Sequence, residues 1–225
     1  MRMSSEQTVK YRLYQDTDAD DMSRLLSEVF AEGDPPAVAV GLEASEFEAF
    51  VRLFCRQAVA QELTIVAHCV ETGEMCGALL TEDSASGLPD GIDQISEKFD
   101  PIFDILGQLD EEYRDGEDVV PGESIHLFLL GVKQSFSGKG VAQELISKCL
   151  ANGASRSYRM AVTEATNKAS QHVFQKQGFA ERVRRSYGAH KFDGRYPFKS
   201  IIEQGGPALM DKNLGSIATE RQMES

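Results

Sequence analysis

A buried strand that leads through a glycine loop into a helix is the segment of this sequence best suited to do chemistry. The almost wholly apolar run 125–132 is followed by SGKGVA at 137–142 and then by a helical pattern. Glycine lets the backbone approach a ligand closely, and the free N–H groups and positive dipole end of a first helical turn favour an anion such as phosphate. Neither GxGxxG nor GxxxxGK[ST] is present, so a dinucleotide or a nucleoside triphosphate is not indicated.

Two spaced elements of the sequence resemble the GNAT superfamily of acetyltransferases. The family's pyrophosphate loop has the form Gln/Arg-x-x-Gly-x-Gly/Ala, and here Gly140 and Ala142 hold the two small positions while Ser137 replaces Gln or Arg. A second family element follows at the expected distance, in residues 167–179. The resemblance implies acetyl-CoA as cosubstrate, with no metal, and a coenzyme site that comprises Leu130, Val132, Ser137, Gly138, Lys139, Gly140, Val141, Ala142, Asn167 and Phe174.

A departure from the common family pattern narrows this resemblance. Most such enzymes have tyrosine where this chain has Phe174, so the usual proton donor to the departing thiolate is missing. The sequence is in this respect similar to the insect-type arylalkylamine N-acyltransferase branch, which has two hydroxyl residues on the preceding turn and helix. Thr166 and Ser170 fall at those positions, and Asp34-Pro35 matches the acidic residue and proline that follow the first helix in that branch. The resemblance implies an N-acetyltransferase acting on a small primary amine by direct attack in a ternary complex.

This chemistry requires an acceptor for the amine proton, donors for the oxyanion and a proton for the leaving sulfur. Asp34 is one candidate base. His126 is another because its ordinary pKa is near 6.5, and Glu123 is a third. Ser170 and Thr166 are candidates for protonating the thiolate. Four of these residues also have a structural interpretation: Asp34 as a helix-end or turn residue, His126 as a satisfied structural residue of the strand, Thr166 as a helix cap and Glu123 as a solvated side chain.

Hydrophobic periodicity predicts the elements that must position these residues. Ser45 and Glu48 suggest a capping box for one helix, and Asn152-Gly153 suggests the end of another. We expect strands at 9–13, 63–70, 75–80, 125–132 and 158–163, two further strands near the end, and helices at 22–30, 45–58, 101–109, 141–152 and 167–177. Together with these elements, the resemblance implies the fold class α/β (α+β), a single GNAT-like domain over 8–214 with about seven mostly antiparallel strands, splayed between the fourth and fifth. We expect a polar tail at 215–225.

Charge and composition exclude several classes of protein. The 225 residues carry a net charge of −13, which argues against nucleic acid or an anionic membrane as partner. Residues 82–123 hold 14 acidic and two basic side chains, a net charge of −12, which indicates either a solvated insertion or a region that attracts cationic substrates. The four cysteines lack CxxC spacing, so we expect neither a zinc site nor a disulfide framework. No apolar run is long enough to span a bilayer, and we expect a cytoplasmic monomer or homodimer.

Two alternatives to a small-amine acetyltransferase stay open from the sequence. Phe174 and Ser137 are compatible with a non-catalytic acyl-CoA-binding or interaction module of the same fold. A protein or peptide N-acetyltransferase is the other alternative, because no sequence feature excludes it.

Overall fold

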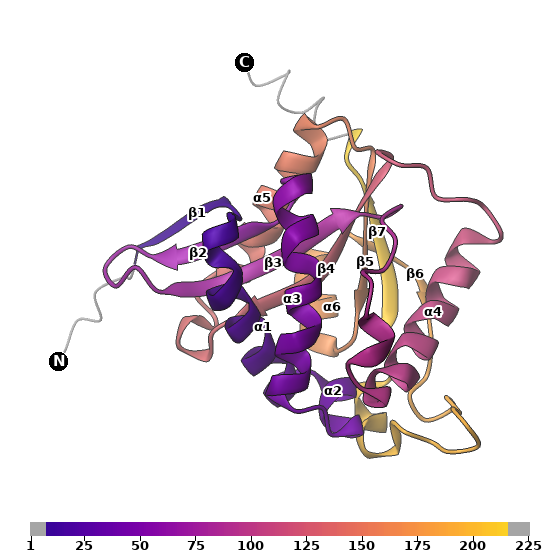
Figure 1. Ribbon diagram of the computed structural model, residues 1–225. Coiled ribbons are helices and arrows are strands. Elements are labelled where there is room, and N and C mark those ends of the chain that lie inside the picture. Colours follow the sequence, from indigo (N-terminus) through magenta and orange to yellow (C-terminus); the bar gives the residue numbers. More distant parts are fainter. Residues whose placement is uncertain (1–7, 216–225) are drawn as a thin grey trace.

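A seven-stranded mixed sheet forms the centre of the computed structural model, which describes residues 8–215 (Figure 1). The strand order is β1-β2-β3-β4-β5-β7-β6, and neighbours are antiparallel except β4 and β5, which are parallel. The strands are β1 (Val9–Leu13), β2 (Ile65–Cys69), β3 (Met75–Asp83), β4 (Ser124–Val132), β5 (Met160–Ala165), β6 (Ala180–Arg184) and β7 (Ala208–Asn213). The predicted fold class is confirmed.

The parallel pair β4 and β5 separates after a short contact. Their pairing covers only Ser124 to His126 on β4, opposite Met160 to Val162 on β5. The register between β3 and β4 shifts within the same region, so that Phe128 is an additional residue on β4, a β-bulge. The sheet is therefore open between β4 and β5 beyond His126, which is the splay that the resemblance implied.

Helices cover both faces of the sheet (Figure 1). One face carries α1 (Ala19–Gly33), α2 (Pro35–Val40), α3 (Ala44–Gln61) and α4 (Asp100–Arg114), and the other carries α5 (Val141–Ser155) and α6 (Lys168–Lys176). Short 3₁₀ turns lie at Asp16–Asp18, Ile92–Gln94, Glu97–Phe99, Gln134–Phe136 and Lys199–Gln204. Within residues 8–215 no helix combines the length and apolar character that crossing a membrane requires. All four cysteines are buried free thiols.

Two helix boundaries differ from the sequence-based expectation. The capping box of α3 is formed by Glu43 and Glu46 rather than by Ser45 and Glu48, and the Glu43 N–H donates to Glu46 Oε2 at 2.9 Å. Helix α5 continues through Gly153 to Ser155. A Cβ at Gly153 would lie 2.7 Å from Ile125 Cδ1, so this glycine allows α5 to approach β4 closely and does not end the helix.

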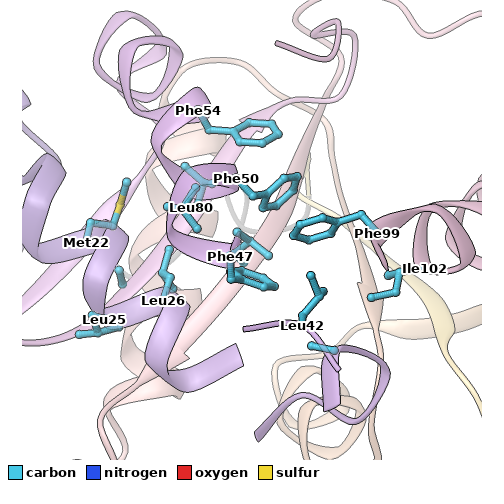
Figure 2. Close-up of a cluster of buried hydrophobic side chains, with 14 of the residues drawn as sticks. Met22, Leu25, Leu26, Leu42, Phe47, Phe50, Phe54, Leu80, Phe99 and Ile102 are labelled. Carbon is cyan, nitrogen blue, oxygen red and sulfur yellow. The ribbon is translucent and has the colours of Figure 1, made fainter. Parts of the chain in front are cut away.

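The acidic insertion 82–123 contributes to the hydrophobic core. Its helix α4 buries Ile102, Ile105 and Leu109, and Phe99 just before the helix is also buried. Figure 2 shows Phe99 beside Phe50 of α3 and Ile102 next to Phe99, and the Phe50 and Phe99 rings stack with centroids 4.7 Å apart. The insertion is therefore an integral part of the domain, and only its outer surface fits the expectation of a solvated segment.

Candidate active site

A cavity of about 200 Å³ lies where β4 and β5 separate, beneath α1, α3 and α4. Its wall is largely apolar and includes seven phenylalanines, namely Phe30, Phe47, Phe50, Phe99, Phe103, Phe128 and Phe174. Its polar lining comes from the residue after α1, from β5, from the turn that follows β5 and from the start of α6, namely Asp34, Thr163, Glu164, Thr166, Asn167 and Ser170. The cavity thus combines an apolar chamber with a few polar groups at one side, the usual character of a small-molecule site.

Asp34 is held at this wall because one helix ends and another begins there. It is the C-cap of α1 and the N-cap of α2, and Pro35 at the first position of α2 fixes the backbone direction. The Ala37 N–H donates to Asp34 Oδ2 at 3.3 Å, and the Thr166 hydroxyl donates to Asp34 Oδ1 at 2.5 Å. Burial raises the pKa of Asp34 to about 6, although these two hydrogen bonds oppose the rise. A carboxylate with this pKa is ionised at neutral pH and is a stronger base than an ordinary aspartate.

Thr166 is itself positioned by a residue that the sequence analysis did not identify. The Tyr187 hydroxyl donates to the Thr166 carbonyl oxygen at 2.7 Å, and Tyr187 is fully buried. Burial raises the pKa of Tyr187, so its phenol stays protonated and remains a donor. Tyr187 lies in an irregular segment after β6, and no local pattern in the sequence marked it.

Ser170 lies on the first turn of α6, next to the same cavity. Asn167 is the N-cap of this helix, and its Oδ1 accepts from the Ser170 N–H at 2.9 Å. The Ser170 hydroxyl donates to the Asn167 carbonyl oxygen at 2.9 Å and can rotate toward a ligand in the cavity. Phe174 follows one turn later and is buried against Phe179, with ring centroids 5.1 Å apart. The expected capping role therefore falls to Asn167 and not to Thr166.

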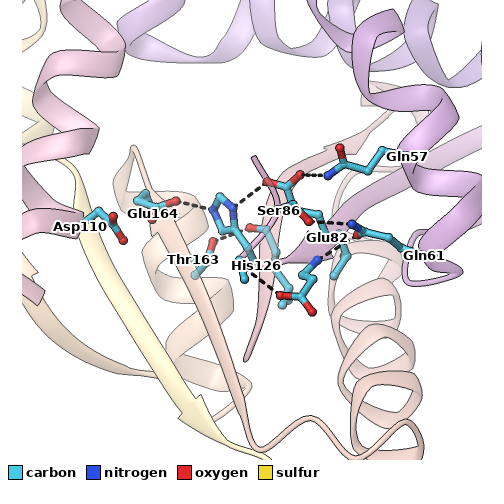
Figure 3. A network of polar contacts seen from close by, with 12 residues as sticks. Gln57, Gln61, Glu82, Ser86, Asp110, His126, Thr163 and Glu164 are labelled. Carbon is cyan, nitrogen blue, oxygen red and sulfur yellow. Dashed lines mark hydrogen bonds and ion pairs between the residues drawn. The ribbon is translucent and has the colours of Figure 1, made fainter. Parts of the chain in front are cut away.

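His126 lies between two carboxylates, as Figure 3 shows. Its Nδ1 is 3.3 Å from Glu82 Oε1, its Nε2 is 2.6 Å from Glu164 Oε2, and Gln57 Nε2 donates to the other Glu82 oxygen at 3.0 Å. Burial alone lowers the pKa of His126, but the charge and hydrogen bond of Glu164, followed by those of Glu82, raise it to about 10. An imidazolium with both nitrogens bonded has no free site for a proton at neutral pH.

The other candidate base, Glu123, lies apart from the cavity. It is exposed, directly before β4, and its carbonyl oxygen accepts from the Arg159 and Met160 N–H groups at 2.8 and 3.2 Å. The structure thus brings Asp34, Thr166 and Ser170 together at one cavity wall and places Glu123 elsewhere.

The glycine loop has the backbone geometry of an anion site. Gly138 and Gly140 have φ angles of +72° and +81°, which favour glycine, and α5 begins directly after them. A Cβ on either glycine would meet no atom within 4 Å, so the space in front of the loop is open. The N–H groups of the first turn of α5, from Val141 onward, have no partner within the helix. Lys133 forms an ion pair with Glu74, and Lys139 Nζ lies 4.8 Å from the centre of the Phe136 ring.

β4 connects this loop to the cavity. Leu130 lines the cavity, and two residues further along Val132 ends the strand that leads into the loop. The nearby basic side chains of β6 are committed to other partners, since Arg182 pairs with Asp211 and Arg184 with Glu181. The cavity, the open strand edges and the glycine loop therefore form one continuous route along β4.

The family profile described as the acetyltransferase (GNAT) family matches residues 43–179, which is more than half of the chain. The chain therefore belongs to this family, and it is an acetyl-CoA-dependent acyltransferase. This confirms the predicted superfamily.

Solved structures with a similar fold include two named N-acetyltransferases and a condensation domain. The C-terminal condensation domain of Ebony in complex with beta-alanyl-dopamine has a TM-score of 0.84 at 13% identity, covering 92% of this chain and 99% of that one. Arylalkylamine N-acetyltransferase 2 from Aedes aegypti has a TM-score of 0.75 at 19% identity, covering 92% and 99%. A Drosophila melanogaster polyamine N-acetyltransferase that catalyses the formation of N-acetylagmatine has a TM-score of 0.71 at 16% identity, covering 92% and 100%. The resemblance to the insect arylalkylamine branch agrees with these neighbours.

Proposed function

We propose that the protein transfers an acetyl group from acetyl-CoA to the primary amine of a small acceptor, by direct attack in a ternary complex. The observation that carries this proposal is the buried Asp34 carboxylate, bonded to the Thr166 hydroxyl at the wall of an aromatic cavity that opens onto the splay. The solved neighbours support this class of substrate. One is bound to beta-alanyl-dopamine, one is an arylalkylamine N-acetyltransferase, and one catalyses the formation of N-acetylagmatine.

The coenzyme would lie along β4. Its pyrophosphate would accept hydrogen bonds from backbone N–H groups of Gly138, Gly140 and the first turn of α5, where the helix dipole is positive, because the Ser137 and Lys139 N–H groups already donate within the preceding turn. Its pantetheine arm would follow Leu130 and Val132 on one side, with Asn167 and Phe174 on the other, and bring the thioester to the cavity. Ser137, in place of the family's Gln or Arg, removes one side-chain contact and leaves the backbone donors intact.

Each step of the transfer has a group of this chain beside it. Asp34 takes a proton from the amine, directly or through a water molecule, and the amine nitrogen forms a C–N bond with the thioester carbon. Main-chain N–H groups of β4 beyond Leu127, where β5 no longer pairs, stabilise the oxyanion. The C–S bond breaks as the intermediate collapses, and the Ser170 hydroxyl supplies the proton to the thiolate and recovers it from solvent. Thr166 positions Asp34 in this scheme, and Tyr187 positions Thr166.

His126 is assigned a structural role in this proposal. Its two carboxylate partners keep it protonated, so it holds β3, β4 and β5 together rather than accepting a proton. We further propose that the protein acts on small molecules, because its net charge of −13 disfavours nucleic acid and anionic lipid. A cytoplasmic monomer or homodimer stays part of this proposal.

Thiol release tests the proposed function. Purified protein is incubated with acetyl-CoA and a panel of arylalkylamines, polyamines and peptides, and free CoA is measured against the rate without acceptor. We expect several small amines to release CoA and to appear as acetylated products by mass spectrometry. Binding of acetyl-CoA without any acceptor-dependent CoA release would favour the non-catalytic module. Release with peptides alone would favour a peptide N-acetyltransferase.

A further inference from the structure

A second cavity, of about 430 Å³, adjoins the first, and the proposed reaction makes no use of it. Ser124, His126 and Val162 of β4 and β5 form one side, and α4 forms another. Four residues line both cavities, namely Phe103, Leu106, Phe128 and Glu164. Side chains alternate along a strand, so Val162 and Glu164 face the same side of β5, toward α4. The two cavities therefore follow each other along β5 and share one wall.

The second cavity carries an excess of negative charge. Three carboxylates line it, and that of Asp110 is paired with Arg114 at 2.6 Å. The other two, Glu82 and Glu164, share His126 as their ion-pair partner, while neutral Gln57 also donates to Glu82 (Figure 3). One imidazolium neutralises one carboxylate, so this group retains one negative charge while both glutamate side chains are only about 15% exposed. A buried charge without a counter-ion is unfavourable, and a cation in the cavity would relieve it.

An unsatisfied polar atom lies in the same cavity. Ser84 lines it, and its hydroxyl oxygen is buried without a hydrogen-bond partner among the described residues. Buried polar groups are normally bonded, so an orphaned hydroxyl indicates a place for a polar ligand atom. This observation is independent of the charge of the carboxylates.

We propose that the second cavity binds a second cationic group at the far end of the acceptor, so that diamines and guanidino-amines are preferred over amines with a single charged end. The orientation rests on the proposed function, since the reacting amine lies at Asp34. The spacer passes Phe103, Leu106 and Phe128, and the distal cation lies at Glu164. Thr166 and Glu164 are two residues apart, so their Cα atoms are separated by about 7 Å, which suits a short alkyl or aryl spacer.

Filling the second cavity tests its role without altering its charge. Gly107 lies within α4, lines the second cavity only, and has no atom within 4 Å of the position of a Cβ. Gly107→Leu should therefore occupy the space that the distal group needs. Gly87→Leu is the matched control, because Gly87 is exposed in the same insertion, has equally open surroundings and lines neither cavity. We expect Gly107→Leu to lower kcat/KM for cadaverine by about tenfold or more, and Gly87→Leu to leave it unchanged.

Removing a charge tests the nature of the subsite. Cadaverine is compared with aminopentanol, which has the same length but a hydroxyl in place of the second ammonium group. The wild type should prefer cadaverine in kcat/KM, and Glu164→Gln should reduce this ratio by about tenfold or more, because a charge-assisted bond is lost. A ratio rather than a rate is measured, so a general loss of folded protein does not imitate the effect.

Other outcomes would overturn the proposal, and they can be told apart from a failure of the proposed function. Equal kcat/KM values for cadaverine and aminopentanol in the wild type, or a ratio that Glu164→Gln does not change, exclude the subsite while acetyl transfer stands. Calorimetric binding of cadaverine is measured without acetyl-CoA in the wild type and in Gly107→Leu. Binding that only the variant loses, in a protein that acetylates no amine, would support the subsite and reject the proposed function.

Discussion

Replacing Asp34 by asparagine is expected to lower activity and raise stability at the same time, because this carboxylate is buried. Burial raises its pKa from an ordinary 3.8 to about 6, so the folded state holds the proton more tightly than the unfolded state. This difference corresponds to about 3 kcal/mol, a contribution that is fully present below pH 4 and is lost as the pH rises through about 6. Above pH 7 the wild type therefore carries the cost of a buried charge that the asparagine variant lacks.

The net effect of Asp34→Asn follows from the two hydrogen bonds of the side chain. The amide oxygen of asparagine can accept from Thr166 or from the Ala37 N–H, but the amide nitrogen cannot accept from the other. One lost bond costs about 1 kcal/mol, which leaves a gain of about 2 kcal/mol at pH 8 and a small loss at pH 4. As a base, Asp34 should contribute about 10²-fold or more to kcat.

Two measurements check this prediction. Urea unfolding at pH 4 and pH 8 gives the free energy of unfolding, and acetyl transfer at saturating acetyl-CoA gives kcat. Asp93→Asn serves as the control, because Asp93 is exposed and lines neither cavity. In the wild type, kcat/KM should rise with pH through about 6 as Asp34 ionises, apart from the ionisation of the amine itself. A stability difference that does not change with pH would refute the buried-charge argument, and an unchanged kcat would remove Asp34 from the mechanism.

Three further predictions concern the coenzyme loop, the proposed acid and the histidine. Gly140→Val should abolish measurable binding of acetyl-CoA in calorimetry, because φ is +81° at this position and the valine side chain would occupy the open space before the loop. Gly116→Val is the control, since Gly116 follows α4 with a φ of +83°, and this variant should bind acetyl-CoA normally. Ser170→Ala should lower kcat about 10²-fold with little change in the Kd for acetyl-CoA, and equal activity would exclude its role. His126→Gln should lower the free energy of unfolding by about 3–5 kcal/mol, because two buried carboxylates lose their shared cation. A variant that keeps its stability and loses only kcat would instead support His126 as the base.

Local sequence patterns predicted most of the elements around the site. The apolar run of β4, the glycine loop and the apolar stripe of α5 are each set by neighbouring residues, so they could be read directly from the sequence. The misassigned capping box of α3 and the extension of α5 past Gly153 have a common cause, since several residues could end or begin each helix locally. Packing against β4 decided the second case, through the contact of Gly153 with Ile125.

The sequence by itself determined the glycine turn before α5, because its φ angles and the free N–H groups depend on Gly138, Gly140 and the helix that follows. Only the tertiary structure decided the surroundings of Asp34, since its hydrogen bond to Thr166 joins residues 132 positions apart. The same holds for His126, whose protonation depends on carboxylates from β3 and β5. A pKa and the shape of a cavity depend on burial and on contacts between distant segments, and these do not exist until the chain has folded.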